Sequence, residues 1–373
     1  MSKIAITGTG LFTPTHSVSN EALVDSFNAF VQLYNEENAS QIRSGELEAL
    51  AESSAEFIEA ASGIKRRYVV DREGILDPQI LVPRLPERAD DEPGVLCEMS
   101  LHAAEEALAK AGRKPGDVDC VIAACSNLER AYPAVAIEVQ NALGCGGHAY
   151  DMNVACSSAT FGIQNAANAL QAGAANCVLL VNPEVCTGHL DFRDRDSHFI
   201  FGDACTAVVL ERSDDAVASE RWEILGTRLS TRFSNNIRNN FGFLNRTRPG
   251  PPAEGERLFR QQGRKVFKEV VPMVAGLIAD HLGQLGLEAR DVRRFWLHQA
   301  NLSMNQLIAR RVLGRDADEK EAPVILDEFA NTSSAGSVIC FHRHRADLAS
   351  GDLGVLCSFG AGYSAGSVVL RKH

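Results

Sequence analysis

The chain has 373 residues, of which 45% are hydrophobic, and a formal net charge of -11 at neutral pH. This content can bury a large core in two units of similar size, and the acidic balance argues against a nucleic-acid partner. No stretch approaches the roughly 18 to 20 consecutive apolar residues of a membrane span. The chain enters "IAITGTG" directly after Met1, Ser2 and Lys3, without the apolar core of a signal peptide. We therefore expect a cytoplasmic protein without a membrane span.

Short apolar runs alternate with alanine-rich helical patterns, which predicts an α/β protein with buried strands. The predicted strands are, in chain order, "KIAITGTG", "CVIAACS", "NCVLLVN", "TAVVLER", "RFWLHQA", "GVLCSFG" and "SVVLRK". The predicted helices cover 98–111, 158–173, 256–284 and 303–313.

Ten cysteines are scattered through the chain without a C-x-x-C pair, which predicts small buried side chains instead of disulfides. The tightest metal-like cluster is "CFHRH", with Cys340, His342 and His344. Its two imidazoles are two residues apart and would diverge on a helix, and no further ligand is near in the sequence. We expect no metal.

The sequence repeats itself. Three pairs of segments match: 111–127 with 285–301, 154–159 with 329–335, and 201–211 with 359–371. The first pair has an offset of 174 residues, from Gly112 to Gly286, and the second places Cys156 opposite Asn331 at an offset of 175. A duplication of this kind predicts two α/β halves related by a pseudo-twofold axis, residues 1–215 and 216–373.

The two copies differ at positions that carry chemistry. Cys156 and Asn331 are equivalent, and His298 follows a strand of the second copy where the first has Ala124. Equivalent loops would converge, so one pocket would hold a thiol, an imidazole and an amide. A helix beginning near Ser157 would direct unpaired N–H groups at Cys156 and favour its thiolate. The small flanking residues leave room for a substrate carbonyl to approach the sulfur.

Papain-like proteases also use Cys, His and Asn in this order, with the later residues roughly 130–150 positions after the cysteine. Here His298 follows Cys156 by 142 residues, so the spacing fits. The sequence around Cys156, "VACSSAT", lacks the protease signature, and the chain is internally duplicated. A protease or thioester hydrolase with this trio stays open as an alternative.

The motifs "DMNVACSSATFG", "FIFGDACTAVVL", "LHQAN", "FANTSSAGS" and "FGAGYSAGS" occur together over nearly the whole chain. In this combination the sequence resembles the β-ketoacyl-acyl carrier protein synthase III family, which are condensing enzymes of the thiolase fold. The resemblance implies two pseudo-symmetric halves in a layered α-β-α-β-α arrangement, a homodimer, and no cofactor. Elongating synthases would have a second histidine at the position of Asn331. Thiolases would have a second cysteine near the C-terminus, with which Cys357 can be compared, but we predict that Cys357 is a buried strand residue.

The resemblance implies two half-reactions. Cys156 takes an acyl group, with acyl-CoA as the expected donor, and malonyl-acyl carrier protein then loses carbon dioxide and attacks the acyl-enzyme. His298 and Asn331 would donate hydrogen bonds to the malonyl thioester oxygen. The acyl-enzyme oxyanion would bind the backbone N–H groups of Cys156 and Ala361, where Ala361 stands at a position that is glycine in the family.

The resemblance also suggests substrate-binding residues. Arg195 matches an arginine that contacts the coenzyme A nucleotide, and Phe57 stands where a tryptophan would stack on the adenine. Ala61 replaces an arginine, which removes one phosphate contact. Tyr132 matches an aromatic residue that reaches across the dimer to limit acyl-chain length, and Asn301 in "LHQAN" is a further candidate.

An acidic enzyme that receives an acidic carrier protein needs a local basic face. Arg257, Arg260, Arg264 and Lys268 are spaced 3, 4 and 4 residues apart and would form one stripe if 256–270 is helical. We predict this stripe as the carrier-protein site, with an ordinary solvated helix face as the alternative.

Two segments look longer than usual in the family, about 24–56 and 71–96, and either could enlarge or cover the acyl tunnel. They suggest a primer longer than acetyl.

The main alternative to a synthase III function is a condensing enzyme that joins two acyl thioesters without malonyl-carrier protein, using Glu129 as base. A non-catalytic partner of a synthase is a further alternative, against which the retained Cys156, His298 and Asn331 argue.

Overall fold

The computed structural model describes residues 3–251, 255 and 257–373. Among these residues, nine strands form one mixed sheet in the order β11-β12-β13-β8-β1-β7-β6-β4-β5. Its strands are β1 (Ile4–Phe12), β4 (Cys120–Ala124), β5 (His148–Met152), β6 (Cys177–Glu184), β7 (Ala204–Arg212), β8 (Trp222–Thr231), β11 (Val292–Leu297), β12 (Leu353–Gly360) and β13 (Ser364–Lys372). Two short ribbons pair β2 (His16–Ser19) with β3 (Arg66–Val69) and β9 (Ile237–Arg238) with β10 (Arg260–Gln261).

Helices cover both faces of the sheet and fill its middle. The helices are α1 (Asn20–Glu37), α2 (Ala39–Ser44), α3 (Ala55–Ser62), α4 (Glu73–Leu76), α5 (Val95–Ala111), α6 (Val135–Leu143), α7 (Ser158–Ala172), α8 (Gly263–Gln284), α9 (Leu302–Leu313), α10 (Leu326–Phe329) and α11 (Ala335–Arg343). Four short 3-10 turns complete the described elements: Pro115–Asp117, Cys186–His189, Phe243–Thr247 and Ala289–Asp291.

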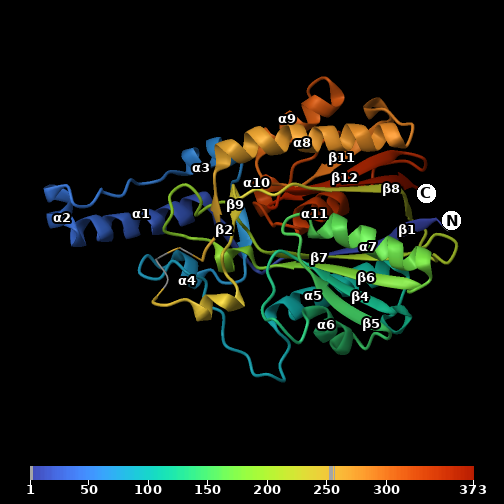
Figure 1. Ribbon diagram of the computed structural model, residues 1–373, viewed down its shortest axis with the longest axis horizontal. Coiled ribbons are helices and arrows are strands. Elements are labelled where there is room, and N and C mark those ends of the chain that lie inside the picture. Colours follow the sequence, from blue (N-terminus) through green and yellow to red (C-terminus); the bar gives the residue numbers. More distant parts are fainter. Residues whose placement is uncertain (1–2, 252–254, 256) are drawn as a thin grey trace.

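The sheet folds back so that α7 and α11 lie between its two groups of strands. Both helices contact strands from each group, such as β6 and β12 for α7 and β1 and β12 for α11. Outside them, α5 and α6 pack on β1, β7, β6, β4 and β5, while α8, with α9 against it, packs on β8, β12 and β13 (Figure 1). The layered α-β-α-β-α arrangement expected from the sequence is therefore confirmed. β1 joins β8 through two antiparallel pairs, Ala5 with Glu223 and Ile6 with Trp222.

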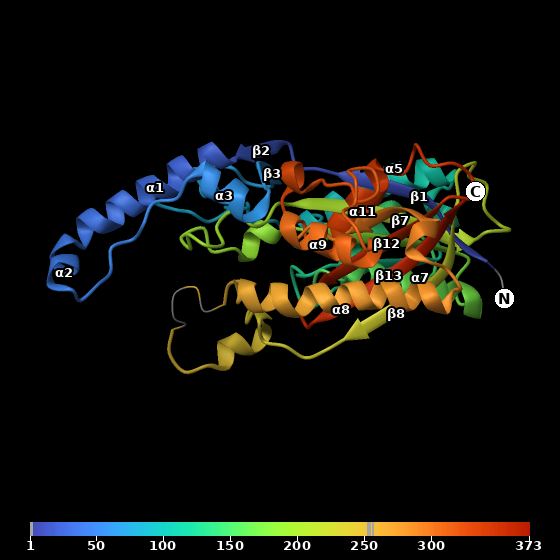
Figure 2. The same cartoon turned by 90° about the horizontal axis from the view of Figure 1, so that it is seen from above.

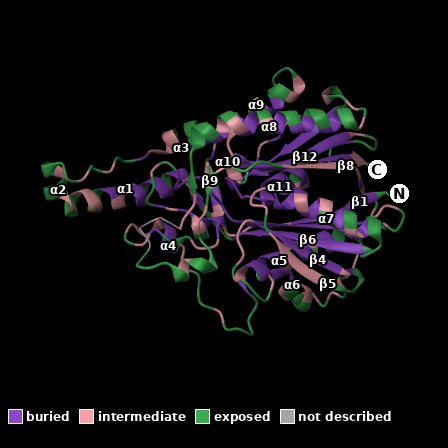
Figure 3. Ribbon diagram, in the orientation of Figure 1, coloured by how far each residue is buried: buried purple, intermediate pink, exposed green. Residues whose placement is uncertain are grey.

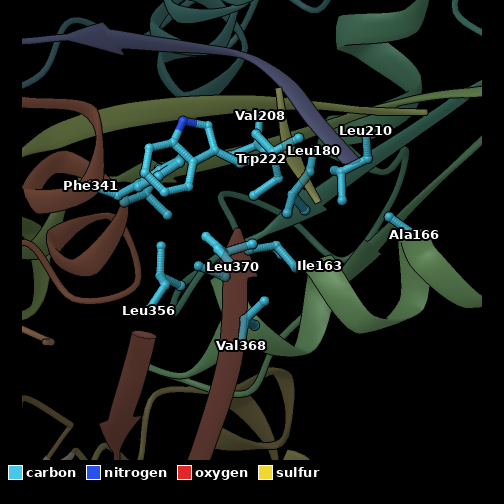
Figure 4. Packing of buried hydrophobic residues seen from close by; sticks show 14 of the residues in the cluster. Ile163, Ala166, Leu180, Val208, Leu210, Trp222, Phe341, Leu356, Val368 and Leu370 are labelled. Atoms are coloured by element: carbon cyan, nitrogen blue, oxygen red, sulfur yellow. The ribbon is translucent and has the colours of Figure 1, made fainter. Parts of the chain in front are cut away.

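The main core lies around the middle layer. Figure 4 shows Ile163 of α7 and Phe341 of α11 facing Trp222, Leu356 and Leu370 of the surrounding strands. Trp222, Trp296 and Phe341 meet edge to face, with ring centroids 4.8 to 5.4 Å apart. Most strands of the sheet, though not β5 and β8, are buried on both faces because helices cover both faces, and Figure 3 shows this burial along the sheet.

All seven predicted strands are present. Two strands of the large sheet were missed, β5 and β8, because their residues are mostly half-buried and lack the continuous apolar run of the others. The four short strands of the two ribbons, β2, β3, β9 and β10, were missed as well. The predicted boundary between residues 215 and 216 stays a prediction, and it falls in the connection between β7 and β8.

Three of the four predicted helices match α5, α7 and α9 to within three residues at each end. The predicted helix over 256–284 was wrong at its start. Residue 256 lies outside the described residues, Arg257 is in a turn, Arg260 is in β10, and α8 begins only at Gly263.

The first of the two long segments forms an arm. Helix α1 leads to α2 at a tip that projects from the body, and the chain returns extended (Figures 1 and 2). Asn28 and Asn35 hold this return, because each side-chain amide both donates to and accepts from the backbone of one residue, Ser53 and Leu50 respectively. The second segment, 71–96, contains α4 and then runs irregularly to α5.

Candidate active site

Cys156 lies in the turn between β5 and α7, as predicted. Ala155 before it has a left-handed backbone, with φ of 47°. The Sγ atom accepts a hydrogen bond from Ser333 Oγ at 3.4 Å, and the backbone N–H groups of Ala361 and of Cys156 itself also point at it. The Ala361 N–H therefore lies beside the sulfur, and its role as an oxyanion donor stays a prediction. It is Gly360 that must be glycine, because a Cβ there would lie 2.9 Å from the sulfur.

The thiol of Cys156 is not activated in the way that the sequence suggested. Burial raises its pKa to about 11, and the negative charge of Glu184 adds to the rise. The hydrogen bonds from Ser333 and from the backbone of Ala361 lower the pKa but do not outweigh burial. The backbone N–H at the start of α7 lowers the pKa of Cys156, as the sequence predicted, but burial outweighs it, and we therefore expect the free thiol to be protonated at neutral pH.

His298 follows β11 directly, and its backbone N–H donates to the Cys357 carbonyl at 2.8 Å. Its ring packs edge to face on Phe359, with centroids 5.2 Å apart. Burial lowers the pKa of His298 to about 4, and the Ser333 backbone opposes this only in part. A neutral imidazole at pH 7 retains one N–H, so the side chain can donate a hydrogen bond without carrying charge.

Asn331 lies between α10 and α11, and Ala330 before it is left-handed, with φ of 54°. Its backbone is fixed on both sides, because its N–H donates to the Ile200 carbonyl and its carbonyl accepts from Gly202. Its Oδ1 accepts from the Ser333 N–H at 2.9 Å. This bond leaves the NH2 group of the Asn331 amide as the free end, which can only donate.

Cys156, His298 and Asn331 all line one cavity of about 590 Å³. The rest of its wall is largely apolar. Apolar residues from several distant segments contribute, namely Phe57, Ile64, Phe199, Ile200, Phe201, Ile237, Phe259, Val266, Phe267, Val270, Met304 and Phe359. A nucleophile, two hydrogen-bond donors and an apolar wall suit an acyl group whose carbonyl is attacked at one end.

The residues predicted for coenzyme A lie beside this cavity. Phe57 lines it, and the Arg195 guanidinium stacks on the Phe57 ring at 4.2 Å from the centroid. Arg195 Nε donates to the Glu52 carbonyl at 2.7 Å. Asn301 also lines the cavity, where its side chain caps α9 and donates to the Ala61 carbonyl at 2.8 Å.

The predicted basic stripe is not a single stripe, because α8 begins after half of it. Arg264 and Lys268 are exposed one turn apart on α8, and Arg264 lines the cavity. Arg260 is exposed in β10, whereas Arg257 lines a separate cavity of about 270 Å³ and donates to the Asn245 carbonyl. The four residues therefore divide between two surfaces.

Two other predicted residues lie away from the thiol. Tyr132 is 85% exposed. Glu129 lines the separate 270 Å³ cavity, where its carboxylate accepts from the Leu96 N–H at 2.5 Å and pairs with Arg130.

The described ranges contain no group of three or more His, Cys, Asp or Glu side chains placed to hold a metal ion. Across residues 3–251, 255 and 257–373, no helix is long and apolar enough to cross a bilayer.

Sequence reasoning missed two residues at the site. Ser333 contacts the sulfur, and the carboxyl of Glu184 lies buried behind it. Ser333 stands within the motif "FANTSSAGS", so its proximity to Asn331 was a usable signal. Glu184 ends a buried strand, where an acidic residue in an apolar run was the available signal.

Known proteins are similar to this chain in fold and in sequence. A crystal structure of 3-oxoacyl-[acyl-carrier-protein] synthase III from Aquifex aeolicus superimposes with a TM-score of 0.76, covering 99% of each chain at 24% identity. Residues 150–232 match the family model for 3-oxoacyl-[acyl-carrier-protein (ACP)] synthase III, and residues 282–372 match the model for its C-terminal part. The fold and site thus define a condensing acyltransferase.

Two curated relatives narrow this class. A beta-ketodecanoyl-[acyl-carrier-protein] synthase of Pseudomonas aeruginosa is 65% identical over 350 residues, which are 94% of this chain and 100% of the relative. A beta-ketoacyl-[acyl-carrier-protein] synthase III of Mesorhizobium japonicum is 30% identical over 88% of this chain and 94% of its own length. The chain belongs to the 3-oxoacyl-[acyl-carrier-protein] synthase III family, whose members catalyse a decarboxylating condensation.

Proposed function

We propose that this enzyme loads a medium-chain acyl group from acyl-CoA onto Cys156 and condenses it with malonyl-acyl carrier protein. The observation that carries the proposal is the convergence of Cys156, His298 and Asn331 on one largely apolar cavity. The product is a 3-ketoacyl-carrier protein two carbons longer than the primer. Its place is fatty acid synthesis or a related pathway.

In the first half-reaction, the sulfur of Cys156 attacks the thioester carbonyl, the carbon–sulfur bond to coenzyme A breaks, and the thiol proton ends on coenzyme A. The oxyanion that forms lies where the backbone N–H groups of Cys156 and Ala361 now point at the sulfur. Because the free thiol is protonated, this step requires the proton to leave Cys156 as the carbonyl approaches.

In the second half-reaction, the malonyl group loses carbon dioxide, and the electron pair of the broken bond passes into an enolate. The N–H of neutral His298 and the NH2 of Asn331 donate to the enolate oxygen. The carbanion attacks the acyl-enzyme, a carbon–carbon bond forms, and Cys156 leaves as a thiolate that regains a proton. A neutral imidazole suits this role, because it donates without protonating the carbanion.

The primer is proposed to be eight carbons long. The Pseudomonas aeruginosa relative is named for a ten-carbon ketoacyl product, which this chemistry builds from an eight-carbon primer. Phe201 and Phe259, with ring centroids 4.8 Å apart, form the cavity wall, and His189 packs on both rings. His189 also lines the separate 270 Å³ cavity, so this aromatic group lies between two apolar spaces and suits a chain longer than acetyl.

The partners follow from the same surfaces. We propose that coenzyme A binds beside the stacked Arg195 and Phe57, and that the carrier protein docks on the face of Arg264 and Lys268. We propose a homodimer, which the exposed Tyr132 supports together with β5, which ends the sheet with one edge unpaired within the described chain. A cytoplasmic location is proposed from the sequence alone. The reaction uses no cofactor in this proposal.

The alternative with Glu129 as base is disfavoured by geometry, because that carboxylate lines the other cavity and already accepts the Leu96 N–H. Retention of full condensation by Glu129→Gln would remove the alternative. A thioester hydrolase with the same trio would release free fatty acid instead of a ketoacyl product.

Intact-protein mass spectrometry tests the proposal. The wild-type enzyme and Cys156→Ala are incubated with acyl-CoAs from two to twelve carbons, and malonyl-carrier protein is then added. We expect a cysteine-dependent adduct, largest with octanoyl-CoA, that disappears as the 3-ketoacyl product forms. An adduct lost equally fast without malonyl-carrier protein would indicate hydrolysis, and no adduct with any acyl-CoA would exclude coenzyme A priming.

A further inference from the structure

A buried carboxyl group lies directly behind the active-site turns. Glu184 is the last residue of β6, and its side chain is 1% exposed. The mechanism proposed above gives it no role. Its position joins segments that are far apart in sequence, because β6 ends beside the turn after β4 and beside the start of α11.

The carboxylate accepts hydrogen bonds from two serines. Ser126, after β4, donates its N–H at 3.0 Å and its Oγ–H at 2.5 Å. Ser334, at the start of α11, donates its N–H at 3.1 Å and its Oγ–H as well. Four serine donors from two segments therefore converge on one buried carboxylate, and the Cys186 thiol adds a fifth at 3.9 Å, which is the arrangement that a buried anion needs.

These bonds fix the turn that carries Asn331. Ser333 lies between Asn331, which accepts its N–H, and Ser334, which is held by Glu184. Ser333 has a left-handed backbone, with φ of 49°, which is unfavourable for a residue with a side chain. Such a conformation persists only where surrounding contacts impose it. Its Oγ thereby reaches the Cys156 sulfur.

The same carboxylate acts on the thiol through its charge. Burial raises the pKa of Glu184 to about 7, and the ionised form raises the pKa of Cys156. Burial keeps the thiols of Cys125 and Cys186 and the imidazole of His298 neutral at pH 7. Besides these three groups, the titratable side chains around Glu184 and Cys156 are Asp151, Asp203 and Cys205.

We propose that Glu184 is a positioning residue that clamps the Asn331–Ser334 turn against the nucleophile and holds a carboxylate charge behind it. The clamp serves the condensation step, in which Asn331 must face the enolate. The charge opposes the acylation step. This inference rests on the proposed function, because it assigns Glu184 to the two half-reactions separately.

The experiment measures the two effects in the same variants. Alkylation of Cys156 by iodoacetamide, followed on its peptide by mass spectrometry, reports the thiolate fraction at pH 8 and at pH 5.5. Single-turnover reaction of the preformed octanoyl-enzyme with malonyl-carrier protein reports condensation. Glu184→Gln removes the charge, while Glu184→Asp and Ser334→Ala keep the charge and weaken the clamp.

We expect Glu184→Gln to alkylate at least threefold faster than wild type at pH 8, where wild-type Glu184 is ionised. At pH 5.5 the two rates should agree within about twofold, because wild-type Glu184 is then protonated. Glu184→Asp and Ser334→Ala should alkylate within about twofold of wild type but condense at least tenfold more slowly. A merely structural role would not produce a rate ratio that follows the ionisation of Glu184.

Glu211→Gln is the matched control. Glu211 is equally buried and lies seven residues away along the β6–β7 ladder, where it pairs with Arg113. The proposal is overturned if Glu184→Gln alkylates like wild type at both pH values, or if the two clamp variants condense like Glu211→Gln. Should Glu184→Gln fail to fold, the two clamp variants decide. Failure of the proposed function would differ, because wild type would then form no octanoyl adduct.

Discussion

The turn at Cys156 and the turn at Asn331 occupy equivalent places in the sequence repeat. Both are preceded by an alanine in the left-handed region, Ala155 and Ala330, and both lead into a central helix. A positive φ at an alanine costs about 1–3 kcal/mol, so the surroundings maintain the backbone at both places. The two equivalent turns therefore present different side chains to one cavity.

The two helix starts are used differently. At α11 the backbone N–H of Ser334 is taken by the carboxylate of Glu184, so this positive helix end faces a protein anion. At the start of α7 the backbone N–H of Cys156 points at its own sulfur, where a substrate oxyanion would form. In the proposed mechanism, the Cys156 turn stabilises transient charge and the other turn holds the Asn331 amide in place.

Removing the Cys156 thiol should have the largest effect on activity, because it abolishes the function of the first turn. Cys156→Ala should form no acyl adduct and lose synthase activity by on the order of 10⁴-fold or more, because no other cysteine is among the described residues that line the cavity. Decarboxylation of malonyl-carrier protein should continue, because His298 and Asn331 remain. Intact mass and release of carbon dioxide measure the two effects. Cys145→Ala, at a half-buried cysteine, is the control, and an adduct on Cys156→Ala would contradict the assignment.

Removing the amide should affect the other half-reaction alone. Asn331→Ala should condense about 10²- to 10³-fold more slowly, the usual cost of one lost oxyanion donor, while acylation stays within a fewfold of wild type. Burst kinetics with octanoyl-CoA followed by malonyl-carrier protein separate the steps. Asn165→Ala, on the exposed face of α7, provides the control. Equal losses in both steps would show that the two turns are not functionally distinct.

The raised pKa of Cys156 predicts a steep pH dependence. Its alkylation rate should increase about tenfold per pH unit over the range from about 8 to 10, because the thiolate is a minor species below a pKa of about 11. Rates of iodoacetamide modification of the Cys156 peptide test this. A plateau beginning near pH 7 would instead mean that the start of α7 activates the thiol, as the sequence first suggested.

Shortening the aromatic wall should have the smallest effect. Phe259→Ala should shift the preferred primer toward longer chains, with each additional buried methylene worth about fourfold in kcat/KM. Competition among acyl-CoAs from six to twelve carbons measures the preference. Phe243→Ala, at a side chain that is 84% exposed, should leave it unchanged. An unchanged preference in Phe259→Ala would place the end of the acyl chain elsewhere.

The candidate site was predictable to the extent that it depended on local motifs. "VACSSA", "LHQAN" and "FANTSSA" identified three side chains that the fold does bring into one cavity. The basic stripe failed because helical spacing was assumed through Arg257 and Arg260, whereas β10 pairs with β9 there. A two-residue strand pairing depends on a distant partner, which spacing along the chain cannot reveal.

The sequence by itself determined the duplicated α/β architecture, because buried strands and amphipathic helices leave a periodic pattern and the repeat aligns equivalent turns. It also predicted the three side chains, Cys156, His298 and Asn331, that the fold brings into one cavity. Only the tertiary structure decided the protonation states of Cys156 and His298, because burial depends on neighbours from distant segments. The tertiary structure also placed Glu184 behind both turns, where its charge and its hydrogen bonds act on residues more than 25 positions away in either direction.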